Sequence, residues 1–102
     1  MDKPKIELNG KTYEMIEPKA RAWRLVSELD ENKKDIPNVE FIERHAAIIA
    51  AFFNVSVEEV LDYMDLADVM KTFYDCYRYM NSALYSKLKK LDSTLGGEEA
   101  KV

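Results

Sequence analysis

The fold is decided by residues 66–91, which read LADVMKTFYDCYRYMNSALYSKLKKL. Apolar side chains recur in this stretch every three or four residues, as they do along one face of an α-helix. The members of this stripe are Leu66, Met70, Phe73, Tyr77, Met80, Leu84, Leu88 and Leu91. Val69, Cys76 and Ala83 widen one flank of the stripe. The pattern predicts a long amphipathic helix, which packs with a central second helix at about residues 39–53.

Three more helices are predicted upstream, at about residues 18–33, 39–53 and 57–63. Pro18 suits a first helical turn, and Asn38 is the expected N-cap of the second helix. Because residues 46–53 are apolar on every side, we expect the second helix to be enclosed. Ser56 and Glu59 have capping-box spacing and open the third helix. Core residues are expected at Trp23, Phe52 and Phe73.

The first part of the chain predicts a β-hairpin over residues 5–16. Asn9-Gly10 supplies the positive φ angles of a type I′ turn between two short segments. Two strands alone are marginal in water, so the hairpin must pack on the helices. The predicted fold class is mostly α: a four-helix single domain over residues 1–91 with a short N-terminal β-hairpin. Residues 92–102 contain Gly96-Gly97 and are expected to form a flexible C-terminal tail.

Composition excludes several classes of protein. The net charge of −4 disfavours nucleic-acid binding, which requires a basic surface. The single cysteine allows no intramolecular disulfide, and the N-terminus lacks the apolar run of a signal peptide. The longest apolar stretch, residues 46–53, is too short to span a membrane. We therefore expect a cytoplasmic protein that binds neither nucleic acid nor membrane.

The sequence contains no recognisable catalytic, cofactor or metal site. His45 is the only histidine and lies on an apolar helix face, where it is expected to pack rather than act as a base or ligand. Cys76 is expected to be a small buried side chain. The aspartates at 62, 65 and 68 lack calcium-loop spacing. The protein is therefore predicted not to be an enzyme.

What remains is a surplus of aromatic and apolar surface. Candidate partner-binding residues lie off the main stripe or at helix ends, and they are Tyr63, Tyr74, Tyr79, Asn81 and Tyr85. Each tyrosine either roofs the core with its hydroxyl in water or anchors a partner, and the sequence leaves both possibilities open. The width of the last helix also suggests a homo-oligomer.

The order of these elements resembles the tail assembly chaperones of long-tailed, siphovirus-type phages and prophages. The likeness covers about residues 5–92. It is carried by a helix with Trp23 and by IELNGKTYE (6–14), FFN (52–54), VEEVL (57–61), Phe73, Tyr77 and Met80. This resemblance implies binding of the tape measure protein, which the chaperone keeps soluble while tail tube protein polymerises around it.

The resemblance also implies action in the cytoplasm of the bacterial host and absence from the mature virion. In many such families, translational frameshifting makes a longer product. Two alternatives are a structural head-tail connector subunit and a small helical DNA-binding regulator. In the regulator, residues 57–91 form a helix-turn-helix, but the acidic start of the last helix is unsuited to phosphates.

Overall fold

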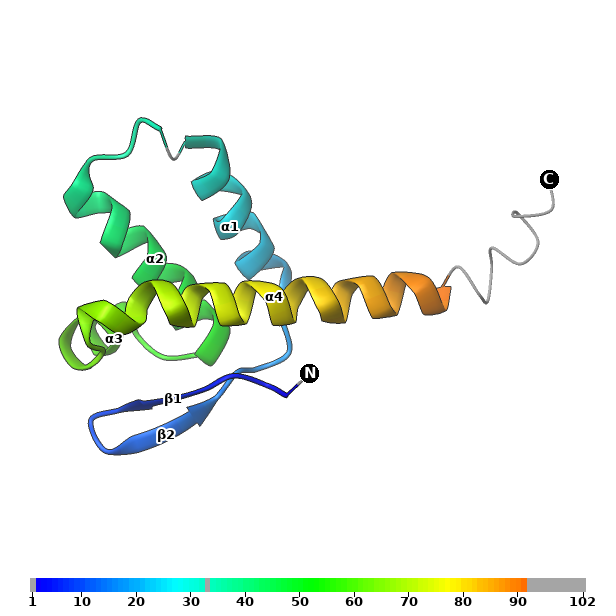
Figure 1. The fold of residues 1–102 in the computed structure, drawn as a ribbon, viewed down its shortest axis with the longest axis horizontal. Helices are drawn as coiled ribbons and strands as arrows, with labels where there is room; N and C mark the ends of the chain where they lie inside the picture. Colours follow the sequence, from blue (N-terminus) through cyan, green and yellow to red (C-terminus); the bar gives the residue numbers. More distant parts are fainter. Residues whose placement is uncertain (1, 33, 92–102) are drawn as a thin grey trace.

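A computed structural model describes residues 2–32 and 34–91, and it confirms the predicted fold class. A two-stranded antiparallel hairpin precedes four helices within these residues (Figure 1). The elements are β1 (Lys5–Leu8), β2 (Lys11–Glu14), α1 (Ala20–Asn32), α2 (Asn38–Phe53), α3 (Val57–Tyr63) and α4 (Leu66–Leu91). The predicted tail, residues 92–102, lies outside the described residues.

Helix α2 is the centre of the fold, because α1, α3 and α4 all pack against it. Its side chains from Ala46 to Phe53 are buried or nearly so, as the all-round apolar pattern predicts. Phe52 has no exposed surface and Phe53 almost none. Burying an apolar side chain of this size contributes roughly 1.5–3 kcal/mol. The turn after α2 uses Asn54 with φ of 55°, a left-handed conformation that asparagine tolerates.

The hairpin packs on the helices through one face. Leu8 and Met15 are fully buried, and Ile6 nearly so. Asn9 and Gly10 have φ angles of 51° and 78°, as a type I′ turn requires. The Ile16 N–H donates to the Phe52 carbonyl at 2.9 Å, which joins the end of the hairpin to the end of α2. Two strands that are marginal alone are thus held by core packing.

Helix α3 begins with the predicted cap. The Glu59 backbone N–H donates to Ser56 Oγ at 3.1 Å, and the Ser56 hydroxyl donates to the Glu59 carboxylate at 3.3 Å. The Tyr13 hydroxyl donates to the other oxygen of that carboxylate, also at 3.3 Å. One glutamate therefore joins the start of α3 to strand β2.

Some details of the sequence prediction are wrong. Trp23 is not a core residue, because 48% of its surface is exposed. The predicted N-cap Asn38 is already helical, and Pro37 occupies the cap position with no side-chain hydrogen bond. Helix α1 begins at Ala20 rather than Pro18. Ala22, Val26 and Leu29 carry the buried face of α1, and Trp23 lies at the edge of that face.

The buried face of α4 is also rotated from the predicted stripe. The fully packed residues are Val69, Phe73, Cys76 and Met80. Two of these belong to the set that was expected only to widen one flank. Leu66, Leu84 and Leu88 of the predicted stripe are exposed, Leu66 by 71% and Leu88 by 53%. The core therefore uses only part of the apolar surface that α4 offers.

Candidate protein-interaction surface

The C-terminal part of α4 extends beyond the other elements (Figure 1). Met80 is its last buried residue, and every residue from Leu84 to Lys90 is exposed. We call residues 81–91 the free half of α4. A helical segment of this length is marginal in water when nothing packs on it. Among residues 81–90, the exposed apolar side chains are Leu84, Tyr85 and Leu88.

An apolar groove of about 460 Å³ lies where the free half of α4 diverges from the start of α1. We call it the α1–α4 groove. Six of its eight lining residues are apolar, and they are Pro18, Ala20, Trp23, Met80, Ala83 and Leu84. Lys19 and Lys87 complete the lining. The groove continues the core face of α4 outward, because its floor begins at the buried Met80.

Small side chains keep this groove open. Ala20 on α1 and Ala83 on α4 each reach only one carbon from the backbone, whereas Trp23 and Leu84 stand taller beside them. Trp23 and Leu84 keep 48% and 39% of their surfaces exposed, so a large part of their apolar contact area is unused. An apolar depression between two helices, bordered by charge, is the form in which proteins receive an amphipathic helix.

Lysines surround one end of the groove. The Glu17 carboxylate lies 3.0 Å from Lys3 Nζ and 3.9 Å from Lys87 Nζ. The hydrogen bond from Lys3, aided by the charges of Lys3, Lys87 and Lys19, lowers the pKa of Glu17. The same hydrogen bond raises the pKa of Lys3. One carboxylate thus faces three ammonium groups, which leaves this end of the groove positively charged.

A second depression, of about 350 Å³, lies among α1, α2 and α4 and is bordered by aromatic rings. The His45 ring centroid is 4.3 Å from that of Phe41 and 4.6 Å from that of Phe73. His45 Nδ1 is 2.7 Å from the Phe41 carbonyl oxygen, so this nitrogen carries the proton. His45 is 3% exposed and packs among the rings, as predicted. The Phe73 ring also contacts Tyr74 and Tyr77.

The structure does not bring the five sequence-predicted candidates into one patch. Tyr74, Asn81 and Tyr85 follow one line on α4, because steps of seven and four residues return to one side of a helix. Tyr74 borders the aromatic depression, and Tyr85 lies on the free half. Tyr79 is turned away from that line and is partly buried against the core. Tyr63 ends α3 and is 49% exposed.

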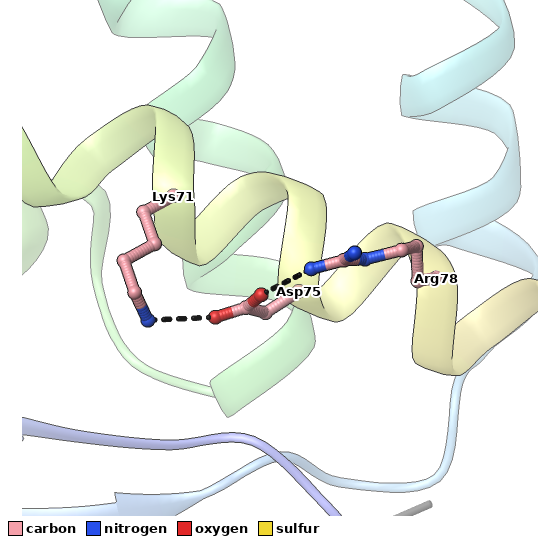
Figure 2. Close-up of polar contacts among 3 residues, drawn as sticks. All are labelled: Lys71, Asp75 and Arg78. Atoms are coloured by element: carbon pink, nitrogen blue, oxygen red, sulfur yellow. Dashed lines mark hydrogen bonds and ion pairs between the residues drawn. The ribbon is translucent and has the colours of Figure 1, made fainter.

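A polar cluster lies on the side of α4 that faces the N-terminal segment, where Asp2, Pro4 and Lys5 line the same depression (Figure 2). Asp75 accepts from Lys71 at 3.1 Å and from Arg78 at 2.8 Å. These two hydrogen bonds lower the pKa of Asp75, with the Lys71 bond contributing most. Such surface ion pairs contribute little to stability. One carboxylate is shared by two largely exposed cations, so the cluster keeps one net positive charge at the surface.

The described residues offer little that could support chemistry. They contain no group of three or more His, Cys, Asp or Glu side chains placed to hold a metal ion. Cys76 is a free, fully buried thiol, and burial raises its pKa to about 12, so the nucleophilic thiolate is suppressed at neutral pH. No helix in the described part of the chain is long and apolar enough to cross a membrane.

Sequence reasoning did not identify the α1–α4 groove. Trp23 carries an apolar signal, but that signal is the same for a core residue and for a groove wall. Ala20 and Ala83 are small, and nothing in the sequence says that they face one another. The groove exists because α1 and α4 diverge, which depends on how each helix packs on α2.

The chain was compared with protein-family models, with curated proteins and with solved structures, and none of the three comparisons gives a match.

Proposed function

We propose that this protein is an assembly chaperone of a phage tail, which binds the tape measure protein and keeps it soluble during tail morphogenesis. The observation that carries the proposal is the α1–α4 groove beside the free half of α4. Trp23, Leu84 and Leu88 there expose apolar surface that the fold itself does not cover. A long helical partner with apolar seams would cover this surface and would itself be protected from aggregation.

The order of elements described in the sequence supports the choice of partner. The hairpin, the enclosed helix and the long final helix resemble the arrangement in tail assembly chaperones of long-tailed phages. Met80 lies at the floor of the groove, where it is 3% exposed, and its unbranched side chain can adjust to a partner seated above it. Methionine adapts to varied apolar partners, which suits a chaperone for a long chain with many similar segments.

Co-expression with the tape measure protein of the same genome tests this proposal. Wild-type protein should move that partner from the pellet to the soluble fraction. Leu84→Glu should abolish this effect, because it places a charge on the wall of the groove. Its melting temperature should change little, since the leucine is 39% exposed. Leu61→Glu is the matched control, because Leu61 is 42% exposed on α3, outside the groove.

The outcomes separate the competing functions. If wild-type protein leaves the tape measure protein insoluble, the chaperone proposal fails. Detection of this protein by mass spectrometry in purified virions would then favour a head-tail connector subunit. Equal loss of partner solubility in Leu84→Glu and Leu61→Glu would place the contact elsewhere. A Tyr74→Glu, Tyr85→Glu double variant tests the neighbouring line of α4 in the same assay.

A further inference from the structure

The two walls of the α1–α4 groove have a charge opposite to that of the chain as a whole. Residues 18–24 contain Lys19, Arg21 and Arg24, and the free half of α4 contains three lysines, at positions 87, 89 and 90. These two stretches hold six of the chain's 15 Lys and Arg but none of its 19 Asp and Glu. The chain carries a net charge of −4, so positive charge is concentrated beside this groove.

Two of these positive side chains belong to the lining of the groove. Lys19 and Lys87 both line the groove. Glu17, at the same end, is the acid that they face, and it is already hydrogen-bonded to Lys3 at 3.0 Å. Its separation from Lys87 Nζ is longer, at 3.9 Å. Lys87 is therefore held only loosely by its own chain, and a partner carboxylate can approach it.

We infer that the α1–α4 groove selects an amphipathic helix whose apolar seam is flanked by Asp or Glu. The inference rests on the proposed function and names the chemistry of the partner segment that the groove receives. The seam covers Trp23, Ala83 and Leu84, and the flanking carboxylates lie against Lys19 and Lys87. Charges on the rim of an interface mainly set partner selection and association rate, while the apolar seam supplies most of the affinity.

The shape of the groove favours a helix over a second copy of this chain. Among the described residues, the acidic surface of a second copy with several exposed apolar side chains is the corner between α3 and α4, with Leu61, Tyr63 and Leu66, whereas Val39 beside Glu40 is a single exposed side chain. Helix α3 has only seven residues, and these three side chains span a bend rather than one straight seam. A continuous partner helix presents its seam along both groove walls, which this corner does not.

Trp23 provides a direct measurement of occupancy. It is the only tryptophan in the chain and is half-exposed in the groove. Its fluorescence emission moves to shorter wavelength when the indole leaves water. Suitable probes are two synthetic helices of about 18 residues that lack tryptophan. Both carry the same leucine seam and the same hydrocarbon staple on the outer face; one has glutamate flanks and the other lysine flanks.

The glutamate-flanked helix should shift the Trp23 emission and bind at least about tenfold more tightly than the lysine-flanked helix at low ionic strength. The Lys19→Glu, Lys87→Glu double variant should reverse this preference. Lys11→Glu with Lys34→Glu is the matched control, because both lysines are exposed and lie outside the groove lining, and the change in net charge is the same. Circular dichroism melting of each variant verifies the fold.

Three results would overturn the inference. The first is equal or tighter binding of the lysine-flanked helix. The second is binding of the glutamate-flanked helix that the groove variant does not weaken. The third is a dimer in analytical ultracentrifugation that the groove variant dissociates, because a second copy would then be the occupant. If any of these occurs while co-expression still keeps the tape measure protein soluble, the chaperone function stands without this selectivity.

Discussion

Two large aromatic residues show how well the burial of a single residue can be predicted from the sequence. Phe52 lies in the enclosed helix α2 and has no exposed surface. Trp23 lies at the edge of the buried face of α1 and is 48% exposed. Both were predicted to be core residues from their apolar character, but only Phe52 is surrounded on every side. The difference in packing should appear directly in stability.

Phe52→Ala is expected to reduce the free energy of unfolding by about 3–5 kcal/mol, because it removes a fully packed ring and leaves a cavity. Trp23→Ala should reduce it by less than about 1.5 kcal/mol, since half of the indole already contacts water. Chemical denaturation of both variants measures the difference. A loss at Trp23 equal to that at Phe52 would contradict the exposed position of the indole.

Local chemistry explains which features of the fold were predicted from sequence. The turn at Asn9-Gly10 and the helix cap formed by Ser56 and Glu59 each involve residues no more than three positions apart. Their conformations can therefore be predicted from the sequence alone. The position of Trp23 depends instead on the path of α4 relative to α1. Trp23 is buried only if another element covers its outer edge, and the sequence of α1 does not contain that information.

At the scale of elements, α3 depends on its cap more than the longer helices do. It has only seven residues, and Val60 is its one buried side chain. Helices this short are unstable without tertiary or capping interactions. Glu59 accepts hydrogen bonds from both Ser56 and Tyr13, so the cap also holds the hairpin against the helices.

Ser56→Ala should therefore destabilise the protein by about 1 kcal/mol, because it leaves the Glu59 N–H without its side-chain acceptor. Ser82→Ala is the matched control, since Ser82 is exposed within α4. That change should be neutral or slightly stabilising, because alanine has the higher helix propensity. Thermal or urea unfolding of the pair gives the comparison. Similar losses in both variants would show that the cap contributes nothing specific.

Helix α4 shows the limit of periodicity as a guide. The 3–4 spacing correctly predicts a helix over residues 66–91, with bounds that match the structure. The spacing marks an apolar stripe, but it does not show which part of the stripe the fold covers. Val69 and Cys76 are buried because α2 crosses α4 on their side, whereas Leu84 and Leu88 lie beyond the end of that contact. The candidate groove arises from the same crossing.

At the scale of the whole molecule, the described chain has a packed body and one projecting helix end (Figure 1). Because the free half of α4 makes few contacts with the body, it should unfold locally without unfolding the rest. Disrupting the helix there should cost little stability in the free protein, whereas the proposed partner would need this segment to be helical.

Glycines placed in the free half of α4 test this separation. Ser82 and Ser86 are exposed, and each lies two residues after a groove residue, Met80 or Leu84. Two residues turn the helix by about 200°, so Ser82 faces away from the groove, and Ser86 lies beside the lining residues without being one of them. A Ser82→Gly, Ser86→Gly variant should change global stability by less than about 0.5 kcal/mol. It should nevertheless bind a partner helix more weakly, because binding must then order a more flexible segment.

Glu43→Gly supplies the contrast, because Glu43 is exposed on α2, which is packed into the body. That substitution should cost about 1 kcal/mol of global stability, the usual penalty for glycine in a helix that must form. It should leave partner affinity unchanged, since α2 does not line the groove. Urea unfolding gives the first quantity, and titration of the Trp23 emission with a glutamate-flanked helix gives the second. If the double glycine variant loses as much stability as Glu43→Gly, the end of α4 folds together with the body, and this surface is not a separate binding element.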